Sequence, residues 1–137
     1  MERFYGNWKV QLDKTMGVAE IGKLMGWTQE IQTLFATLNY VLLIEASGNN
    51  TRCCIDYGVV KIEFFFTLGE VFDYKSAEGT KSKCTIILDD GKLVESYVTD
   101  EGAQWRTERV LNGTSMTATT MFAGHPNIKC VQTLLKV

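Results

Sequence analysis

Residue types that could carry out covalent catalysis are scarce in this sequence. The chain contains one histidine, His125, which precedes Pro126 in a segment with the composition of a turn. A serine or cysteine nucleophile needs a general base within hydrogen-bond reach, and histidine is the usual one. We interpret His125 as a solvated turn residue and assign no catalytic residue, so we do not expect an enzyme.

The cysteines lack the spacing of a metal site. Cys53 and Cys54 are adjacent, and Cys84 and Cys130 lie far from them along the chain. Without a CxxC spacing and with a single histidine, the sequence has no zinc constellation. It also has no glycine-rich motif of the kind that cradles phosphate. We therefore expect free, mostly buried thiols, no metal and no cofactor.

Some polar residues lie in segments with the alternation of β-strands. Side chains alternate between the two faces of a strand, so Thr107 and Arg109 share one face. If this face and that of Gln132 both point inward, Arg109 and Gln132 can meet. A buried guanidinium needs a partner, and a ligand carboxylate is a natural one. In the alternative arrangement Arg106 points inward, or Arg109 lies outside beside Glu108.

The length and composition indicate one globular domain, residues 1–137. Hydrophobic residues make up 45% of the chain and charged residues 22%. A net charge of −2 without a Lys/Arg cluster argues against a nucleic-acid partner. The longest apolar run, residues 40–44, is too short for a membrane span, and no signal-peptide pattern follows the N-terminus. We expect a cytoplasmic protein.

Most of the chain has the pattern of a β-meander. Short runs rich in Val, Ile, Thr, Phe and Tyr alternate with Gly, Asn and Asp separators that suit tight hairpins. The predicted strands lie at residues 4–12, 40–46, 51–57, 59–67, 70–75, 81–88, 92–99, 104–111, 115–122 and 128–136. So many antiparallel strands in a short chain predict an all-β fold: a ten-stranded, up-and-down barrel, closed or nearly closed.

The segment after the first strand has helical spacing instead and predicts two short helices, a lid over about residues 14–37. The residues that recur at this spacing are Met16, Glu20, Lys23, Leu24 and Trp27, then Ile31, Leu34, Phe35 and Leu38. Glycine inside a helix costs about 1 kcal/mol relative to alanine. With Gly17, Gly22 and Gly26, the first helix should be short and soft.

Residues 4–10 have the sequence FYGNWKV, and residues 66–73 have the sequence FTLGEVFD. These segments resemble the Phe-x-Gly-x-Trp-Lys opening and the Phe-x-Leu-Gly-x-x-Phe-Asp motif of the intracellular lipid-binding family, the cytosolic fatty-acid-binding and cellular retinoid-binding proteins. Residues 83–86, 90–93 and 101–105 match its later strands in order. The matches cover nearly the whole chain.

The resemblance implies a ten-stranded barrel with a helix-turn-helix portal and a cavity for one fatty acid or retinoid. It places ligand-binding residues in three groups: Met16, Trp27 and Ile31 near the lid; Val59, Ala77 and Glu78 near the portal turns; and Tyr97, Thr107, Arg109, Gln132 and Leu134 near the inner headgroup site. Trp105, which shares a strand face with Thr107 and Arg109, is also predicted to bind the ligand.

The headgroup positions depart from the usual fatty-acid pattern. Fatty-acid binders of the family usually end in an Arg-x-Tyr that grips the carboxylate, and the matching positions here are Gln132 and Leu134. Cys130-x-Gln132 looks more like the retinol-binding branch, where a glutamine meets an alcohol. The family's preceding Arg/Gln position falls on Thr107 or on Arg109, depending on the alignment.

The lid also departs from the family. Its usual Asn-Phe-Asp motif is replaced by residues 15–17 (TMG). Members that unload by membrane collision often have a basic first helix, whereas Lys14 and Lys23 are offset here by Asp13, Glu20 and Glu30. The charge balance argues against strong electrostatic docking to a membrane. We expect a monomer whose lid contacts membranes transiently.

The leading hypothesis is therefore a cytosolic carrier of a long-chain fatty acid, in which Arg109 balances the carboxylate and Gln132 donates a hydrogen bond. The alternative within the binding class is a retinoid or another neutral isoprenoid. Two further hypotheses remain. One is a lipid-modifying enzyme that uses a cysteine or His125, and the other is a structural barrel with a filled interior.

Overall fold

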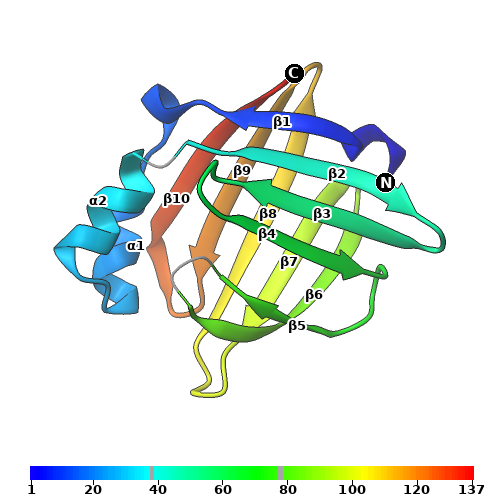
Figure 1. Ribbon diagram of the computed structural model, residues 1–137. Helices are drawn as coiled ribbons and strands as arrows, with labels where there is room; N and C mark the ends of the chain where they lie inside the picture. Colours follow the sequence, from blue (N-terminus) through cyan, green and yellow to red (C-terminus); the bar gives the residue numbers. More distant parts are fainter. Residues whose placement is uncertain (38, 77–78) are drawn as a thin grey trace.

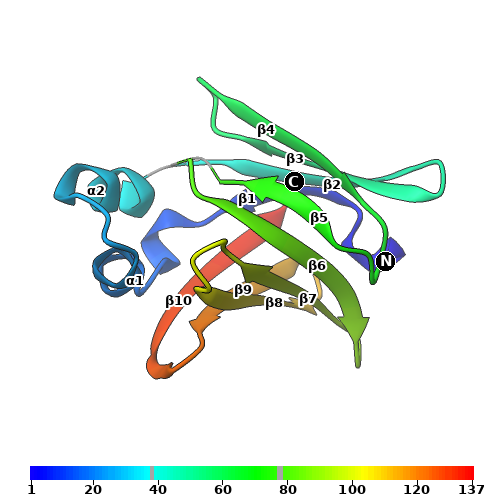
Figure 2. The ribbon, with the colours of Figure 1, turned by 90° about the horizontal axis from the view of Figure 1, so that it is seen from below.

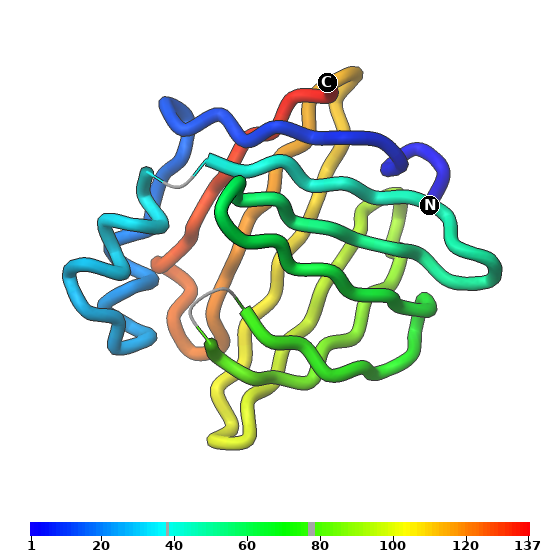
Figure 3. Tube along the Cα trace, in the orientation of Figure 1, coloured from blue at the N-terminus to red at the C-terminus, as the bar shows by residue number. Residues whose placement is uncertain are grey.

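The computed structural model describes residues 1–37, 39–76 and 79–137 and consists mainly of one antiparallel sheet wound into a barrel (Figure 1). The chain runs through the strands as a nearly continuous meander (Figure 3). The strands are β1 Gly6–Val10, β2 Val41–Ser47, β3 Asn50–Asp56, β4 Lys61–Phe66, β5 Phe72–Lys75, β6 Lys81–Asp89, β7 Lys92–Val98, β8 Gln104–Asn112, β9 Ser115–Phe122 and β10 His125–Lys136.

The barrel is nearly closed. The strand order is β4-β3-β2-β1-β10-β9-β8-β7-β6-β5, so β1 pairs with β10 and the two edges are β4 and β5. Aromatic rings join these edges, because Phe72 of β5 stacks on Phe64 and Phe66 of β4 at centroid distances of 5.7 and 6.1 Å. The predicted ten-stranded antiparallel barrel with helices after its first strand is confirmed.

Two helices, α1 Val18–Met25 and α2 Gln29–Thr37, follow β1 and lie together at one end of the barrel (Figure 2). Gly17 and Gly26 bound α1 in the left-handed conformation, at φ 85° and 73°. Gly22 lies inside the helix, where a Cβ would come within 2.4 Å of Gln32 Cγ on α2. The glycines thus begin and end α1 and allow the two helices to pack closely.

The first helix is shorter than the spacing from Met16 to Trp27 predicted. Its buried residues are Val18, Ile21 and Gly22. Gly17 and Gly26 bound the helix, so Met16 and Trp27 lie outside it. Glu20 and Lys23, which recur at the predicted helical spacing, are inside the helix but exposed. Short 3₁₀ turns, Glu2–Phe4 and Leu12–Lys14, also replace the ends of the first predicted strand.

A packed apolar core fills one part of the interior. Its most deeply buried side chains are Trp8, Ile44, Cys84, Ile86, Leu93, Met116 and Leu134. The Trp8 indole donates a hydrogen bond to the Phe4 carbonyl at 2.9 Å, which satisfies its polar atom. Within the described residues, neither helix has the length and apolar character needed to cross a membrane.

Candidate functional site

Strands β7 to β10 position the site by simple alternation. Side chains alternate between the faces of a strand, so every second residue faces the interior. From the core toward the helices, the inward residues are Leu93, Glu95 and Tyr97 on β7; Leu111, Arg109, Thr107 and Trp105 on β8; Met116, Ala118, Thr120 and Phe122 on β9; and Leu134, Gln132 and Cys130 on β10. The register places Arg109 and Gln132 on either side of the small Ala118.

A cavity of about 210 Å³ lies between these strands and the helices. Its lining consists of Val18, Ile21, Met25, Trp27, Phe35, Tyr74, Ser76, Glu95, Tyr97, Trp105, Thr107, Arg109, Ala118, Thr120, Phe122, Cys130 and Gln132. A second cavity of about 160 Å³ is lined by Phe35, Tyr40, Leu42, Ile55, Tyr57, Arg109 and Gln132. Since Phe35, Arg109 and Gln132 line both, the two cavities meet at this polar pair.

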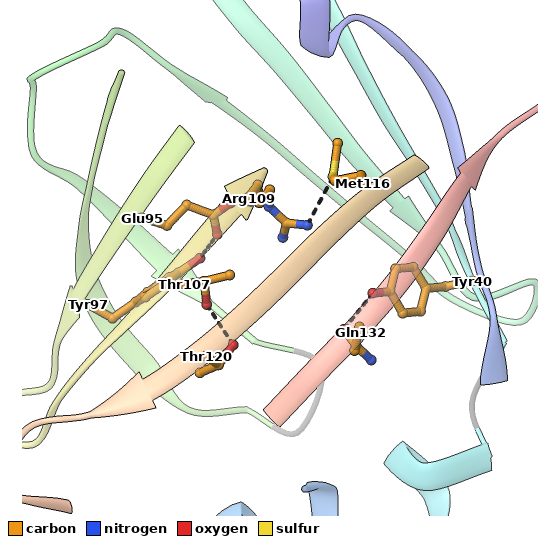
Figure 4. Close-up of polar contacts among 8 residues, drawn as sticks. All are labelled: Tyr40, Glu95, Tyr97, Thr107, Arg109, Met116, Thr120 and Gln132. Carbon is orange, nitrogen blue, oxygen red and sulfur yellow. Dashed lines mark hydrogen bonds and ion pairs between the residues drawn. The ribbon is translucent and has the colours of Figure 1, made fainter. Parts of the chain in front are cut away.

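Arg109 already has a protein partner. Its Nε donates to Glu95 Oε2 at 2.5 Å, and the Tyr97 hydroxyl donates to Glu95 Oε1 at 2.5 Å (Figure 4). The two side chains of the ion pair are 14% and 8% exposed. Arg109 Nη1 also contacts Met116 Sδ at 3.7 Å. Both oxygens of the carboxylate are therefore engaged by interior groups.

The electrostatic environment keeps Arg109 charged and the neighbouring phenols and thiols neutral. Burial alone lowers the pKa of Arg109, but the adjacent Glu95 carboxylate raises it, and the net pKa is above the ordinary value. Burial and the same carboxylate raise the pKa of Tyr97, and burial raises the pKa of Tyr40. Burial also raises the pKa of the Cys53 thiol to about 12. Phenols and thiols around the pair are thus uncharged near neutral pH.

Two further hydrogen-bonded pairs lie on the cavity wall. The Tyr40 hydroxyl donates to Gln132 Oε1 at 2.7 Å, and the hydroxyls of Thr107 and Thr120 are 2.8 Å apart (Figure 4). Within the described part of the chain, Gln132 Nε2 and Arg109 Nη2 donate no hydrogen bond. The groups left to meet a ligand at this end are therefore mainly donors.

Aromatic rings form the rest of the wall. Tyr97 stacks on Trp105 at 5.3 Å, and Trp105 contacts Phe122 at 5.8 Å. On the lid side, Trp27 stacks on Phe35 at 4.8 Å. These rings give the cavity a largely apolar, stiff surface suited to a hydrocarbon chain. Among the described residues, no group of three His, Cys, Asp or Glu side chains could hold a metal ion.

The structure places the predicted site residues in two sets. Those that line the first cavity are Tyr97, Trp105, Thr107, Arg109, Gln132 and Trp27. The others lie elsewhere: Leu134 in the packed core, Met16 exposed before α1, Ile31 half-buried on α2, and Val59 exposed in the turn between β3 and β4. Ala77 and Glu78 lie outside the described residues.

Sequence reasoning missed three residues of the polar cluster: Glu95, Tyr40 and Thr120. A signal for Glu95 was present, because it has the same parity as Tyr97 on a predicted strand and stands between two inward positions. Tyr40 had no local signal, since its partner Gln132 is 92 residues away. Arg106, the alternative inward arginine, is exposed and pairs with Glu108 at 3.3 Å.

Sequence comparison finds relatives along most of the chain. The intestinal fatty acid-binding protein of Homo sapiens is 30% identical over 122 residues, which are 88% of this chain and 91% of that protein. The intestinal protein of Xenopus laevis is 29% identical over the same shares of the two chains. The liver fatty acid-binding protein of Lethenteron camtschaticum is 36% identical over 57% of this chain and 68% of its own. No protein-family model matches the sequence.

Solved structures share the whole fold. The Echinococcus granulosus fatty-acid-binding protein 1 superposes with a TM-score of 0.90 at 23% identity, over 100% of this chain and 99% of its own. A Schistosoma mansoni fatty acid binding protein in complex with arachidonic acid superposes with a TM-score of 0.89 at 17% identity, over 100% and 98%. The fold follows from these structures and the kinship from the 30% identity, so the chain belongs to the fatty-acid-binding protein family, the intracellular lipid-binding proteins that its motifs resemble.

Proposed function

We propose that the protein is a carrier that takes one long-chain fatty acid into its barrel and transports it through the cytosol. The observation that carries this proposal is the cavity between an aromatic wall and the helices, with polar donors at its inner end. The relatives described above are fatty acid-binding proteins, and the Schistosoma mansoni protein was solved with arachidonic acid. These findings support a fatty-acid ligand.

Burial of the hydrocarbon chain is expected to dominate affinity. Each buried methylene contributes about 0.8 kcal/mol, so a sixteen-carbon chain offers roughly 12 kcal/mol before the costs of association. One hydrogen bond contributes about 1 kcal/mol net. The polar groups around Arg109 and Gln132 therefore fix where the head lies rather than how tightly the chain binds.

The carrier role includes entry and release at the helical end. Large apolar side chains are exposed before α1, on α2 and in the turn between β3 and β4: Met16 is 63%, Leu34 52% and Val59 96% exposed. Such side chains support transient contact of the lid with a membrane. We infer a monomeric carrier without enzymatic activity, in keeping with relatives that are binding proteins.

Titration of the delipidated protein with oleate tests this function, with one site per chain as the expected result. Ala118 is 4% exposed and opposes both Arg109 and Gln132, so Ala118→Phe should fill the meeting point of the cavities and weaken binding at least tenfold. The matched control is Thr119→Phe on the other face of β9, which should bind as the wild type does. The proposal is contradicted if both variants bind oleate as the wild type does, or if the wild type does not bind oleate.

A further inference from the structure

Glu95 is the feature that a simple carboxylate-binding cavity does not require. It is 6% exposed and lies in the cavity wall, where both of its oxygens accept hydrogen bonds, from Arg109 and from Tyr97. A buried carboxylate is costly unless it is paired. The cation that would otherwise receive a ligand anion therefore has a counter-ion supplied by the protein itself.

The surroundings of Glu95 contain no second cation among the described residues. The titratable groups that face it from the neighbouring elements are Arg109 on β8, Tyr97 on β7, Cys84 on β6, Cys53 on β3 and Tyr40 before β2. The thiols and phenols are neutral near neutral pH, because burial raises the pKa of each of them. The inner site is thus a one-to-one ion pair with no net charge.

The hydrogen-bonding capacity that remains free beside Arg109 consists mainly of donors. Arg109 Nη2 and the Gln132 amide are available as donors, while both oxygens of Glu95 are already used. A ligand head that accepts hydrogen bonds can satisfy these donors. It needs no negative charge, since the guanidinium is already neutralised.

A carboxylate head fits this arrangement poorly. Placed on the free donors of Arg109, it lies near Glu95 as well, so attraction to the guanidinium is opposed by repulsion from the carboxylate. The loss of its hydration on burial is then left without compensation. A hydroxyl or a carbonyl oxygen accepts the same hydrogen bonds and loses far less hydration.

We propose that Glu95 makes the inner site selective for an uncharged head, so that a long-chain alcohol, ester or amide binds more tightly than the carboxylate with the same chain. This inference rests on the proposed carrier function and refines the ligand class of the same cavity: a fatty acid binds through burial of its chain, and an uncharged lipid with a chain of the same length binds more tightly. Glu95 acts as a specificity-determining residue: it sets the charge that the donors of Arg109 present.

A competition experiment on the full-length, delipidated protein tests this selectivity. The protein is offered equal amounts of oleate and oleyl alcohol at pH 7.4, and the retained lipids are extracted and quantified by mass spectrometry. The wild type should retain the alcohol in at least tenfold excess. Glu95→Gln, which frees Arg109, should shift the ratio toward oleate at least tenfold. The double variant Glu95→Gln/Arg109→Gln, which has neither charge, should return the ratio to that of the wild type.

The change in ratio between variants is independent of the aqueous solubility of the two lipids, because each variant faces the same mixture. Equal or greater retention of oleate by the wild type overturns the proposal, even if a variant fails to fold. An unchanged ratio in a folded Glu95→Gln protein also overturns it. In both cases a lipid is still bound, so the carrier function stands. Retention of neither lipid by the wild type overturns the carrier function itself, and this inference with it.

Discussion

The core end and the lid end of the interior are built on the same strands, β7 to β10. At the core end these strands present Leu93, Leu111, Met116 and Leu134, and at the lid end Glu95, Arg109, Thr120 and Gln132. The apolar side chains pack against one another in a single buried cluster. The polar ones are held in pairs by hydrogen bonds, so they cannot collapse on one another, and the space beside them stays open.

Residues that stabilise the fold and residues that select the ligand thus lie on the same strands. One step of two residues along β10 leads from Leu134, which is 0% exposed, to Gln132 on the cavity wall. The core end should therefore carry most of the folding free energy. Substitutions at the lid end should change which ligand binds and lower the free energy of unfolding only slightly.

The largest effect is expected from a substitution in the core end. Leu134→Ala should lower the free energy of unfolding by about 3 kcal/mol, because it leaves a cavity among fully buried side chains. Gln132→Ala on the same strand should lower it by about 1 kcal/mol, through loss of the hydrogen bond with Tyr40. Urea denaturation measures both. Equal losses would show that the two ends do not differ in this way.

The next effect concerns the ion pair. Arg109→Met should lower the free energy of unfolding by about 2 kcal/mol, since it removes the hydrogen bond between two charged groups and leaves Glu95 on the cavity wall without its cation. Adding Glu95→Gln to this variant should restore most of the loss, because the uncompensated charge is then removed. A double-mutant cycle in urea gives the coupling free energy. Additive losses from the two substitutions would mean that the pair is not coupled.

The reactivity of the cysteine thiols allows the core end and the lid end to be compared in the wild-type protein. Burial raises the pKa of Cys130, on the cavity wall, to about 11 and that of Cys53, in the core, to about 12. Because the thiolate is the reactive form, both react slowly at pH 8 and faster as the pH rises toward these values. Cys130 should be alkylated by iodoacetamide about tenfold faster than Cys53.

Bound oleate should slow the alkylation of Cys130 and leave that of Cys53 unchanged, since Cys130 lines the cavity. Peptide mapping by mass spectrometry follows each site separately. Faster labelling of Cys53 than of Cys130, or protection of Cys53 alone, would place the accessible space at the wrong end of the barrel.

The strands could be predicted from sequence because their signals are local. Turns rich in Gly, Asn and Asp delimit them, and the run at residues 115–122 coincides with β9. The prediction failed where local signals mislead: Val59 and Val60 have strand propensity but lie in the turn before β4. Both lid helices are present, but the first is shorter than its predicted extent, because Gly17 and Gly26 bound it.

The polar cluster could be predicted only in part. Alternation assigns Thr107 and Arg109 to one face, but it does not show which partner Arg109 has. The contact with Glu95 depends on the register between β7 and β8 and on the direction of a long side chain. The contact between Tyr40 and Gln132 requires β1 to pair with β10, because β1 lies between β2 and β10.

The smallest effect is expected on the outer face of β8, the strand that also contains Arg109. Arg106 pairs with Glu108 at 3.3 Å, with side chains 53% and 24% exposed, so Arg106→Met should change the free energy of unfolding by less than about 0.5 kcal/mol. In 1 M salt this difference should vanish, because the screening length falls to about 3 Å, whereas the loss in Arg109→Met should persist inside the barrel. Urea denaturation at low and high salt compares the same substitution on the two faces of β8. If both losses respond alike to salt, the Arg109–Glu95 pair is as solvated as a surface pair, and the distinction between the core and lid ends cannot rest on its burial.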